Sequence, residues 1–212
     1  MIIIKSFSLR IYSLFLALTL SLALPASAEE ASADKVISQA SQEILQQIAP
    51  RKDELRKDSA KLYGLVENII VPHFDFDAIS RRVLGKTWKE ASADQQARFS
   101  AAFKNLLIRT YSTALLEYSG EQIDWQPLDA PADAERVIKK AEVTLTSGQV
   151  VPMNWGLHKV DGAWKVYDIN IDGISLVTNY RSVFAGEVRK NGLDSLIQRL
   201  ESKNANDTSA SG

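Results

Sequence analysis

Apolar residues recur every three or four positions through the first half of the chain. This spacing predicts helices over residues 36–48, 55–70, 79–84 and 99–118. Pro50 and Pro72 end the first two of these helices, because proline cannot continue a helix, and Gly85 and Gly120 end the other two. A capping-box pattern that begins at Ser92 precedes the longest helix. The first half of the chain is therefore predicted to be helical.

From residue 123 the apolar period changes to two. This pattern predicts strands over residues 123–125, 137–145, 151–157 and 164–171, with turns at Ser147-Gly148 and Asp161-Gly162. Helical spacing returns over residues 177–188 and 193–200. We therefore predict an α+β fold. A twisted antiparallel sheet of about four strands has helices packed on one face and encloses an apolar pocket.

The first 28 residues have the three parts of a cleavable secretory signal. Lys5 and Arg10 provide a positive start, an apolar run follows over residues 11–24, and small residues end the segment at Ala28. The run is shorter than the roughly 20 apolar residues that span a bilayer. We therefore expect a signal peptide over residues 1–28, cleavage after Ala28 and export as a soluble protein.

Composition limits the classes of function. The 212 residues include 25 basic and 26 acidic side chains and no cysteine. This balance argues against nucleic-acid binding, and a cysteine-linked lipid anchor is excluded. The rest of the chain is predicted to form a single domain over residues 29–202, followed by a disordered polar tail over residues 203–212.

Residues suited to metal binding or catalysis are few. His73 and His158 have no second ligand at metal spacing, so both are interpreted as structural and no metal site is expected. Asp75 and Asp77 precede the helix over residues 79–84 and are interpreted as N-caps. We identify no catalytic motif.

Several segments, in order along the chain, together resemble the MlaC family, also called the Ttg2 or toluene-tolerance auxiliary family. They are VPHFDF at residues 71–76, VLGKTW at 83–88, FKNLLIRTY at 103–111, WKVYDI at 164–169 and GISLVTNYR at 173–181. Each segment is short, but the ordered set spans almost the whole chain after the leader.

The resemblance implies a periplasmic phospholipid carrier with an NTF2-like fold and a pocket for acyl chains. It would move lipid between an outer-membrane lipoprotein-porin complex and an inner-membrane ABC transporter that bears an MCE-domain protein, and so maintain outer-membrane lipid asymmetry. The cargo would be the only bound molecule, with no further cofactor. We expect a monomer that is not an enzyme.

Apolar residues of the sheet and of the helices that could face it are the candidates for the pocket lining. They are Val83, Leu84, Phe103, Leu107, Tyr111, Val143, Leu145, Val151, Met153, Trp155, Val166, Ile169 and Tyr180. Basic residues could form a rim for a phosphate head group or for acidic partner surfaces. The candidates are Arg81, Arg82, Lys86, Arg136, Lys139 and Lys140.

Two alternatives remain open at this point. Asp168 or Asp172 could act as a general base in an NTF2-like enzyme, although a role in the strand-to-helix turn is the simpler interpretation. The chain could also be a ligand-free binding adaptor, in which case its core would be packed without a cavity.

Overall fold

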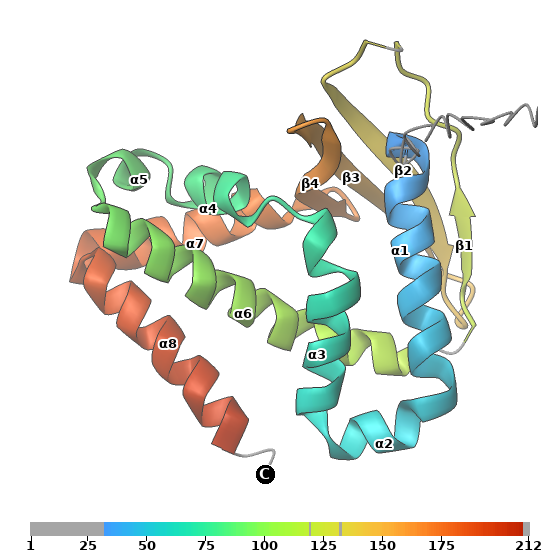
Figure 1. The fold of residues 1–212 in the computed structure, drawn as a ribbon, viewed down its shortest axis with the longest axis horizontal. Helices are drawn as coiled ribbons and strands as arrows, with labels where there is room; N and C mark the ends of the chain where they lie inside the picture. The colour runs from blue at the N-terminus through green and yellow to red at the C-terminus, as the bar shows by residue number, and fades with distance from the viewer. Residues whose placement is uncertain (1–31, 119, 132, 210–212) are drawn as a thin grey trace, which may run out of the picture.

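The computed structural model describes residues 32–118, 120–131 and 133–209, so the leader predicted over residues 1–28 lies outside the described residues (Figure 1). The first half contains α1 (Ala33–Ile48), η1 (Ala49–Arg51), α2 (Lys52–Lys57), α3 (Ser59–Ile69), η2 (Val71–His73), α4 (Phe76–Leu84), α5 (Lys86–Glu90) and α6 (Ala93–Glu117). The second half contains β1 (Gln122–Trp125), β2 (Arg136–Thr144), β3 (Val150–Val160), β4 (Ala163–Ile171), β5 (Ile174–Ser175), α7 (Leu176–Asn191) and α8 (Leu193–Ser209). Within these described ranges, no helix combines the length and the apolar composition that crossing a bilayer requires.

Helix starts follow the capping signals in the sequence. The Ser92 hydroxyl accepts a hydrogen bond from the backbone N–H of Gln95 at 3.1 Å, and the Gln95 side chain accepts one from the backbone N–H of Ser92 at 3.0 Å. This capping box confirms the predicted start of α6. Asp58 and Ser175 cap α3 and α7 by accepting from backbone N–H groups of the first turn, which have no partner inside the helix.

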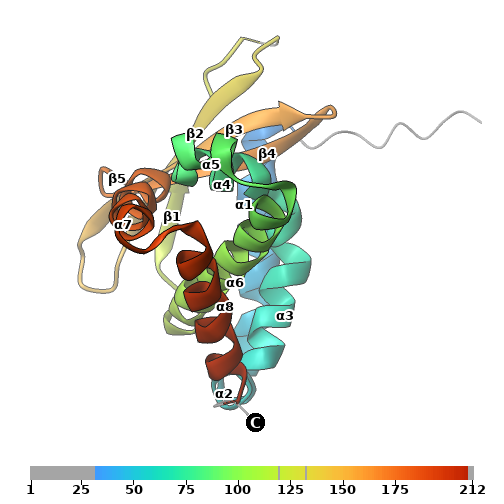
Figure 2. The same cartoon turned by 90° about the vertical axis from the view of Figure 1, so that its left-hand side faces the viewer.

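The strands form one antiparallel sheet in the order β1-β2-β3-β4-β5. The register pairs Val137 with Leu157 and Leu157 with Val166, so these side chains share the face that α1 covers through Ile37. The sheet has one strand more than the four expected, because Ile174–Ser175 pairs with the end of β4. Figure 1 shows α4 and α7 beside β4, with α6 and α8 below them, and Figure 2 shows β2, β3 and β4 rising above α3, α6 and α8.

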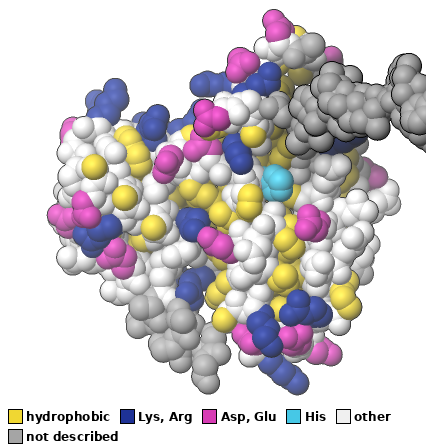
Figure 3. All heavy atoms as spheres, in the orientation of Figure 1, with side chains coloured by type: hydrophobic (Ala, Val, Ile, Leu, Met, Phe, Trp, Pro, Cys, Tyr) yellow, Lys and Arg dark blue, Asp and Glu magenta, His cyan; other side chains and the backbone are white. Residues whose placement is uncertain are grey.

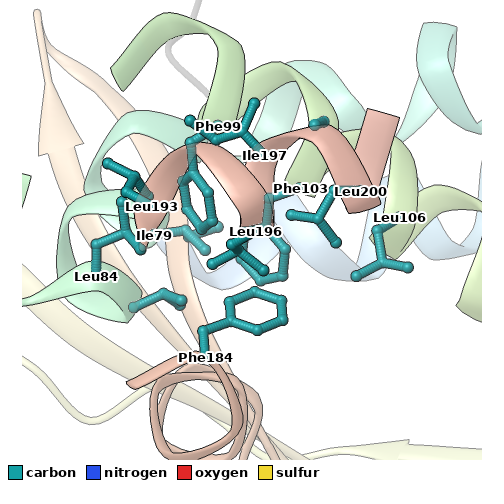
Figure 4. Close-up of a cluster of buried hydrophobic side chains, with 12 residues drawn as sticks. Ile79, Leu84, Phe99, Phe103, Leu106, Phe184, Leu193, Leu196, Ile197 and Leu200 are labelled. Atoms are coloured by element: carbon teal, nitrogen blue, oxygen red, sulfur yellow. The ribbon is translucent and has the colours of Figure 1, made fainter. Parts of the chain in front are cut away.

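Buried hydrophobic side chains of the described residues gather in three clusters. The helical cluster lies between α4, α6, α7 and α8, where the rings of Phe99, Phe103 and Phe184 contact one another (Figure 4). The sheet cluster lies between α1 and the sheet, and the third cluster lies among α1, α3 and α6. Phe74 is partly buried and packs against both the helical and the sheet cluster. These two clusters therefore meet along a seam at Phe74.

Asp75 links α4 to the sheet at this seam. Its backbone N–H donates to the carbonyl of Val166 in β4 at 2.9 Å, next to an isolated parallel bridge between Phe74 and Val166. Oδ1 of Asp75 accepts from the backbone N–H of Ala78 at 2.8 Å, which confirms the N-cap predicted for Asp75, whereas Asp77 lies inside the first turn of α4 and is not a cap. Oδ2 lies 2.9 Å from Nε2 of His158 in β3, so this histidine is a structural one. A single residue thus starts a helix and binds two strands.

The last helix is longer than the sequence pattern indicates. α8 continues to Ser209 and so includes residues 203–209 of the segment predicted to be a disordered tail. Asn204 is buried, and its side-chain amide donates to the carbonyl of Ala102 in α6 at 3.0 Å. This contact anchors the polar sequence after Ser202 on α6. Residues 210–212 lie outside the described residues.

A buried lysine holds the start of α1 on the sheet. The Lys139 side chain is only 3% exposed, and its Nζ lies 2.6 Å from Oδ1 of Asp34 and 2.5 Å from the carbonyl of Gln126. Strand alternation turns Ile138 and Lys140 to the other face of the sheet. Lys139 therefore lies under α1 and away from any rim, contrary to its predicted place.

We expect Asp75→Ala to lower the free energy of unfolding by about 2 kcal/mol, because it removes a helix cap and a half-buried hydrogen bond. Asp77→Ala is the matched control, since the Asp77 side chain is exposed, and it should change stability by less than about 0.5 kcal/mol. Urea unfolding of both variants measures the difference. Equal losses would contradict the link at Asp75.

The buried pair of Lys139 and Asp34 should respond unequally to removal of its two members. Asp34→Ala leaves an ammonium group buried beside the Gln126 carbonyl, and it should cost about 2 kcal/mol after allowance for the exposure of Asp34. Lys139→Met removes the charge and keeps the volume, so it should cost less than about 1 kcal/mol. Denaturant midpoints would refute this explanation if Lys139→Met proved the more damaging change.

Candidate functional site

An apolar pocket lies on the seam between the helical and the sheet cluster. Its lining residues are Phe74, Ile79, Phe103, Leu107, Asp168, Ile169, Leu176, Val177 and Tyr180, from η2, α4, α6, α7 and β4 and the residues next to them. Ile79 and Phe103, labelled in Figure 4, belong to the helical cluster, whereas Ile169 packs on the sheet cluster. The walls of the pocket therefore belong to two separate groups of packed side chains.

The pocket is narrow in this structure. Its volume is about 30 Å³, which is about the space of one water molecule. Sites that hold small organic ligands usually measure roughly 300–1,000 Å³. A ligand with a long apolar chain can enter only if the walls separate.

Tyr180 forms part of the wall contributed by α7. Its ring centre lies 5.0 Å from that of Phe103 and 5.5 Å from that of Phe184. Burial raises the pKa of the Tyr180 hydroxyl, and a hydrogen bond with the Tyr111 side chain raises it further. Tyr180 is therefore neutral near pH 7. Since Tyr111 is 37% exposed, the two hydroxyl groups provide a polar edge beside an apolar pocket.

The structure brings some of the predicted lining residues together. Phe103 and Leu107 from α6, Ile169 from β4 and Tyr180 from α7 all line the pocket. Tyr111 is one helical turn beyond Leu107 and interacts with Tyr180. These residues come from segments that are far apart in the sequence.

The other predicted lining residues lie elsewhere. Val83 and Leu84 are inside the helical cluster, and Met153, Trp155 and Val166 belong to the sheet cluster under α1. Val143 in β2 pairs with Val151 in β3 next to the turn that joins these two strands, and Leu145 follows β2. Met153, Trp155 and Val166 do not line the pocket because α1 covers the face of the sheet on which they lie. Periodicity shows that a face is apolar, but it does not show which helix covers it.

Four apolar lining residues were missed by the sequence analysis, namely Phe74, Ile79, Leu176 and Val177. Phe74 and the α7 residues lie within the segments VPHFDF and GISLVTNYR, and Ile79 has helical spacing with Val83. Their apolar character was visible in the sequence. Their common position depends on the link at Asp75 and on the cap that starts α7.

None of the six basic residues predicted as a rim lines the pocket. Arg81, Arg82 and Lys86 surround the end of α4, and Arg136 and Lys140 extend from the face of β2 that α1 does not cover. Lys139 is buried in the ion pair with Asp34. Among the described residues, Asp168 is the only charged one in the lining.

Asp168 and Asp172 have structural roles. Asp168 accepts hydrogen bonds from the Ser175 hydroxyl at 2.7 Å and from the backbone N–H of Val177 at 3.2 Å, and so supports the start of α7. Asp172 is exposed and has a positive φ of 50° in the turn between β4 and β5. This arrangement matches the strand-to-helix turn, the simpler of the two interpretations. The described residues also contain no cluster of three His, Cys, Asp or Glu side chains that could hold a metal ion.

A close contact positions α4 on the sheet next to the pocket. The register of β3 and β4 shifts at Gly156, and a Cβ atom at this position would lie 2.8 Å from Cζ of Tyr167. The Arg82 guanidinium lies 4.0 Å from the centre of the same ring. Tyr167 therefore packs between the strand backbone and a cation from α4, a favourable cation–π arrangement.

The comparisons with known proteins agree with this architecture. The family model described as MlaC protein matches residues 38–202. The chain belongs to the MlaC family. This confirms the resemblance found in the sequence segments.

Two curated relatives of this MlaC-family chain cover most of its length. Toluene tolerance protein Ttg2D of Pseudomonas putida is 30% identical over 160 residues, which are 75% of this chain and 74% of the relative. The intermembrane phospholipid transport system binding protein MlaC of Haemophilus influenzae is 26% identical over 176 residues, or 81% of this chain and 82% of the relative.

A solved structure also matches this member of the MlaC family. The phospholipid-binding protein of Ralstonia solanacearum, in complex with a phospholipid, is 33% identical and has a TM-score of 0.76. The match covers 83% of this chain and 98% of that chain. The α+β fold of this chain is therefore one that holds a phospholipid in a relative.

We expect Gly156→Ala to lower the free energy of unfolding by about 2 kcal/mol, because the new methyl group displaces the Tyr167 ring. Gly64→Ala in α3 is the control. No atom lies within 4 Å of the new methyl group there, so stability should rise by about 0.5–1 kcal/mol. Thermal unfolding measures both changes. In a Tyr167→Ala background most of the Gly156→Ala cost should vanish, and a cost that persisted would contradict the contact.

Proposed function

We propose that this MlaC-family protein is a non-catalytic phospholipid carrier that encloses acyl chains at the seam pocket. The observation that carries the proposal is the match to the Ralstonia protein, which binds a phospholipid in the same fold. The lining of the seam pocket supports it, since every side chain except Asp168 is apolar or aromatic. Asp168 is already engaged by Ser175 and Val177.

The energy of moving a lipid through water explains why the pocket must be apolar. Two acyl chains carry roughly 30 CH₂ groups at about 0.8 kcal/mol each, so exposing them to water costs on the order of 20 kcal/mol. A carrier must therefore enclose the chains almost completely. The charged head group is expensive to bury, and the lining has no basic side chain to pair with it. In this proposal the head group stays outside, near the edge formed by Tyr111 and Tyr180.

Loading requires the pocket to expand from its narrow state. We infer that the helical and sheet clusters move apart along the seam, because this exposes apolar surface on both sides without opening either cluster. The link at Asp75 would keep the two parts connected during this movement. When no lipid is bound, closure keeps the same surface away from water.

The compartment and the partners follow from the leader and the family resemblance. A cleavable signal peptide would deliver the chain to the periplasm, which separates the two membranes of a Gram-negative cell. There the carrier would act as a monomer between an outer-membrane lipoprotein-porin complex and an inner-membrane ABC transporter with an MCE-domain protein. This transfer would maintain the lipid asymmetry of the outer membrane.

Lipid extraction tests the proposal directly. Gently purified protein should release phospholipid that is detected by native mass spectrometry and thin-layer chromatography. Delipidated protein should take up phospholipid from vesicles. Failure of both would refute the carrier and favour a binding adaptor without ligand.

The location of the chains can be tested on α7. Val177→Trp fills the pocket from its lining, so it should reduce uptake of fluorescent phospholipid from vesicles by about tenfold or more. Val183→Trp is the matched control, since Val183 is 55% exposed on the same helix, and uptake should stay within about twofold of wild type. Unchanged uptake in Val177→Trp would show that the chains bind elsewhere.

A further inference from the structure

Basic side chains surround Gly85 at the C-terminal end of α4. Arg81, Arg82, Lys86, Lys89 and Arg181 form this surface, which we name the α4 patch. All of them are exposed except Arg82, which is half-buried. Figure 3 shows Lys and Arg side chains along the edge of the molecule over α4 and α5, at the upper left.

No residue of the α4 patch forms an ion pair with a carboxylate of the described residues. Other surfaces differ, since Arg98 pairs with Glu201 at 2.8 Å and Arg199 with Glu187 at 2.6 Å. Asp77 and Glu90 are the carboxylates on α4 and α5, and neither pairs with a basic residue of the patch. The positive charge of the patch is therefore not balanced by ion pairs.

Each of the three guanidinium groups of the patch lies against a neighbouring group of the protein. Arg81 lies 6.0 Å from the ring centre of Trp88, and Arg82 lies 4.0 Å from that of Tyr167. Arg181 packs on Gly85, where an added Cβ atom would be 3.0 Å from its Nη2. A guanidinium that is already held in place loses less entropy when it pairs with a carboxylate.

The helices that carry the patch also form walls of the pocket. Arg82 is one turn from Ile79 on α4, and Arg181 follows Tyr180 on α7. We propose that the α4 patch docks an acidic surface on the protein that delivers lipid to the pocket or receives lipid from it. This inference rests on the proposed carrier function and names the chemistry of its partner.

The observations favour a protein over an anionic membrane. Binding to a lipid surface usually combines basic residues with exposed apolar side chains that insert into it. Trp88, which lies beside the patch on α5, is half-buried and packs against the helical cluster. Val183 is exposed, but it lies two residues from Arg181 and so faces another side of α7. Fixed guanidinium groups suit carboxylates held in fixed positions by a folded partner.

The test uses Lys86→Glu/Lys89→Glu, which reverses two exposed charges that make no contact with the pocket lining. The control Lys57→Glu/Lys203→Glu makes the same change in net charge on α2 and α8. The probes are poly-L-glutamate, envelope membranes with and without protease treatment, and phosphatidylcholine vesicles with and without phosphatidylglycerol. Binding is measured at low and high salt.

Wild type should bind poly-L-glutamate and untreated envelope membranes, and high salt or protease treatment should weaken the membrane binding. The patch variant should bind both probes about tenfold more weakly, and the control should stay within about twofold of wild type. Equal losses in both variants would overturn the proposal. A loss on phosphatidylglycerol vesicles that persists on protease-treated membranes would assign the patch to lipid instead. Lipid uptake from neutral vesicles should be unchanged in the patch variant, and failure of uptake in wild type would count against the carrier function alone.

Discussion

The link at Asp75 is the constraint on which the rest of the structure depends. Its carboxylate starts α4 and binds His158 of β3, while its backbone N–H binds Val166 of β4. These three bonds fix where α4 lies against the sheet. From that position α4 places Ile79 in the pocket and Arg82 on the ring of Tyr167. A short segment between two helices thus determines the geometry of both the apolar site and the charged surface.

The division of the hydrophobic side chains into separate clusters has a functional meaning. One continuous core at close-packed density would resist the entry of an acyl chain, because every side chain would have to rearrange. Here each cluster has almost fully buried members, such as Phe103 and Leu157, and among the described residues only Phe74 packs against both clusters. The pocket lies where these two clusters meet.

Local signals made much of the fold predictable. Caps such as Ser92 and Asp75 act over three residues, and their roles were read correctly from the sequence. The pocket depends on contacts between distant segments, so only part of its lining was found. Phe103 and Tyr180 were identified, whereas Val177 was not, because its position depends on the turn that Asp168 and Ser175 cap. Lys139 shows the same limit. Strand alternation places it on the other face of the sheet from Ile138 and Lys140, but it does not show which of the two faces α1 covers.

The narrow pocket and the α4 patch share two helices, α4 and α7. An empty apolar site is most stable when closed, so the carrier gains nothing by opening in water. Opening must therefore be favoured by a contact that exists only at a partner. α4 and α7 are suited to receive such a contact, since each carries both pocket residues and basic residues that form no ion pair within the described residues, with Arg82 one turn from Ile79 and Arg181 next to Tyr180. Charge pairing outside and apolar packing inside then act on the same two helices.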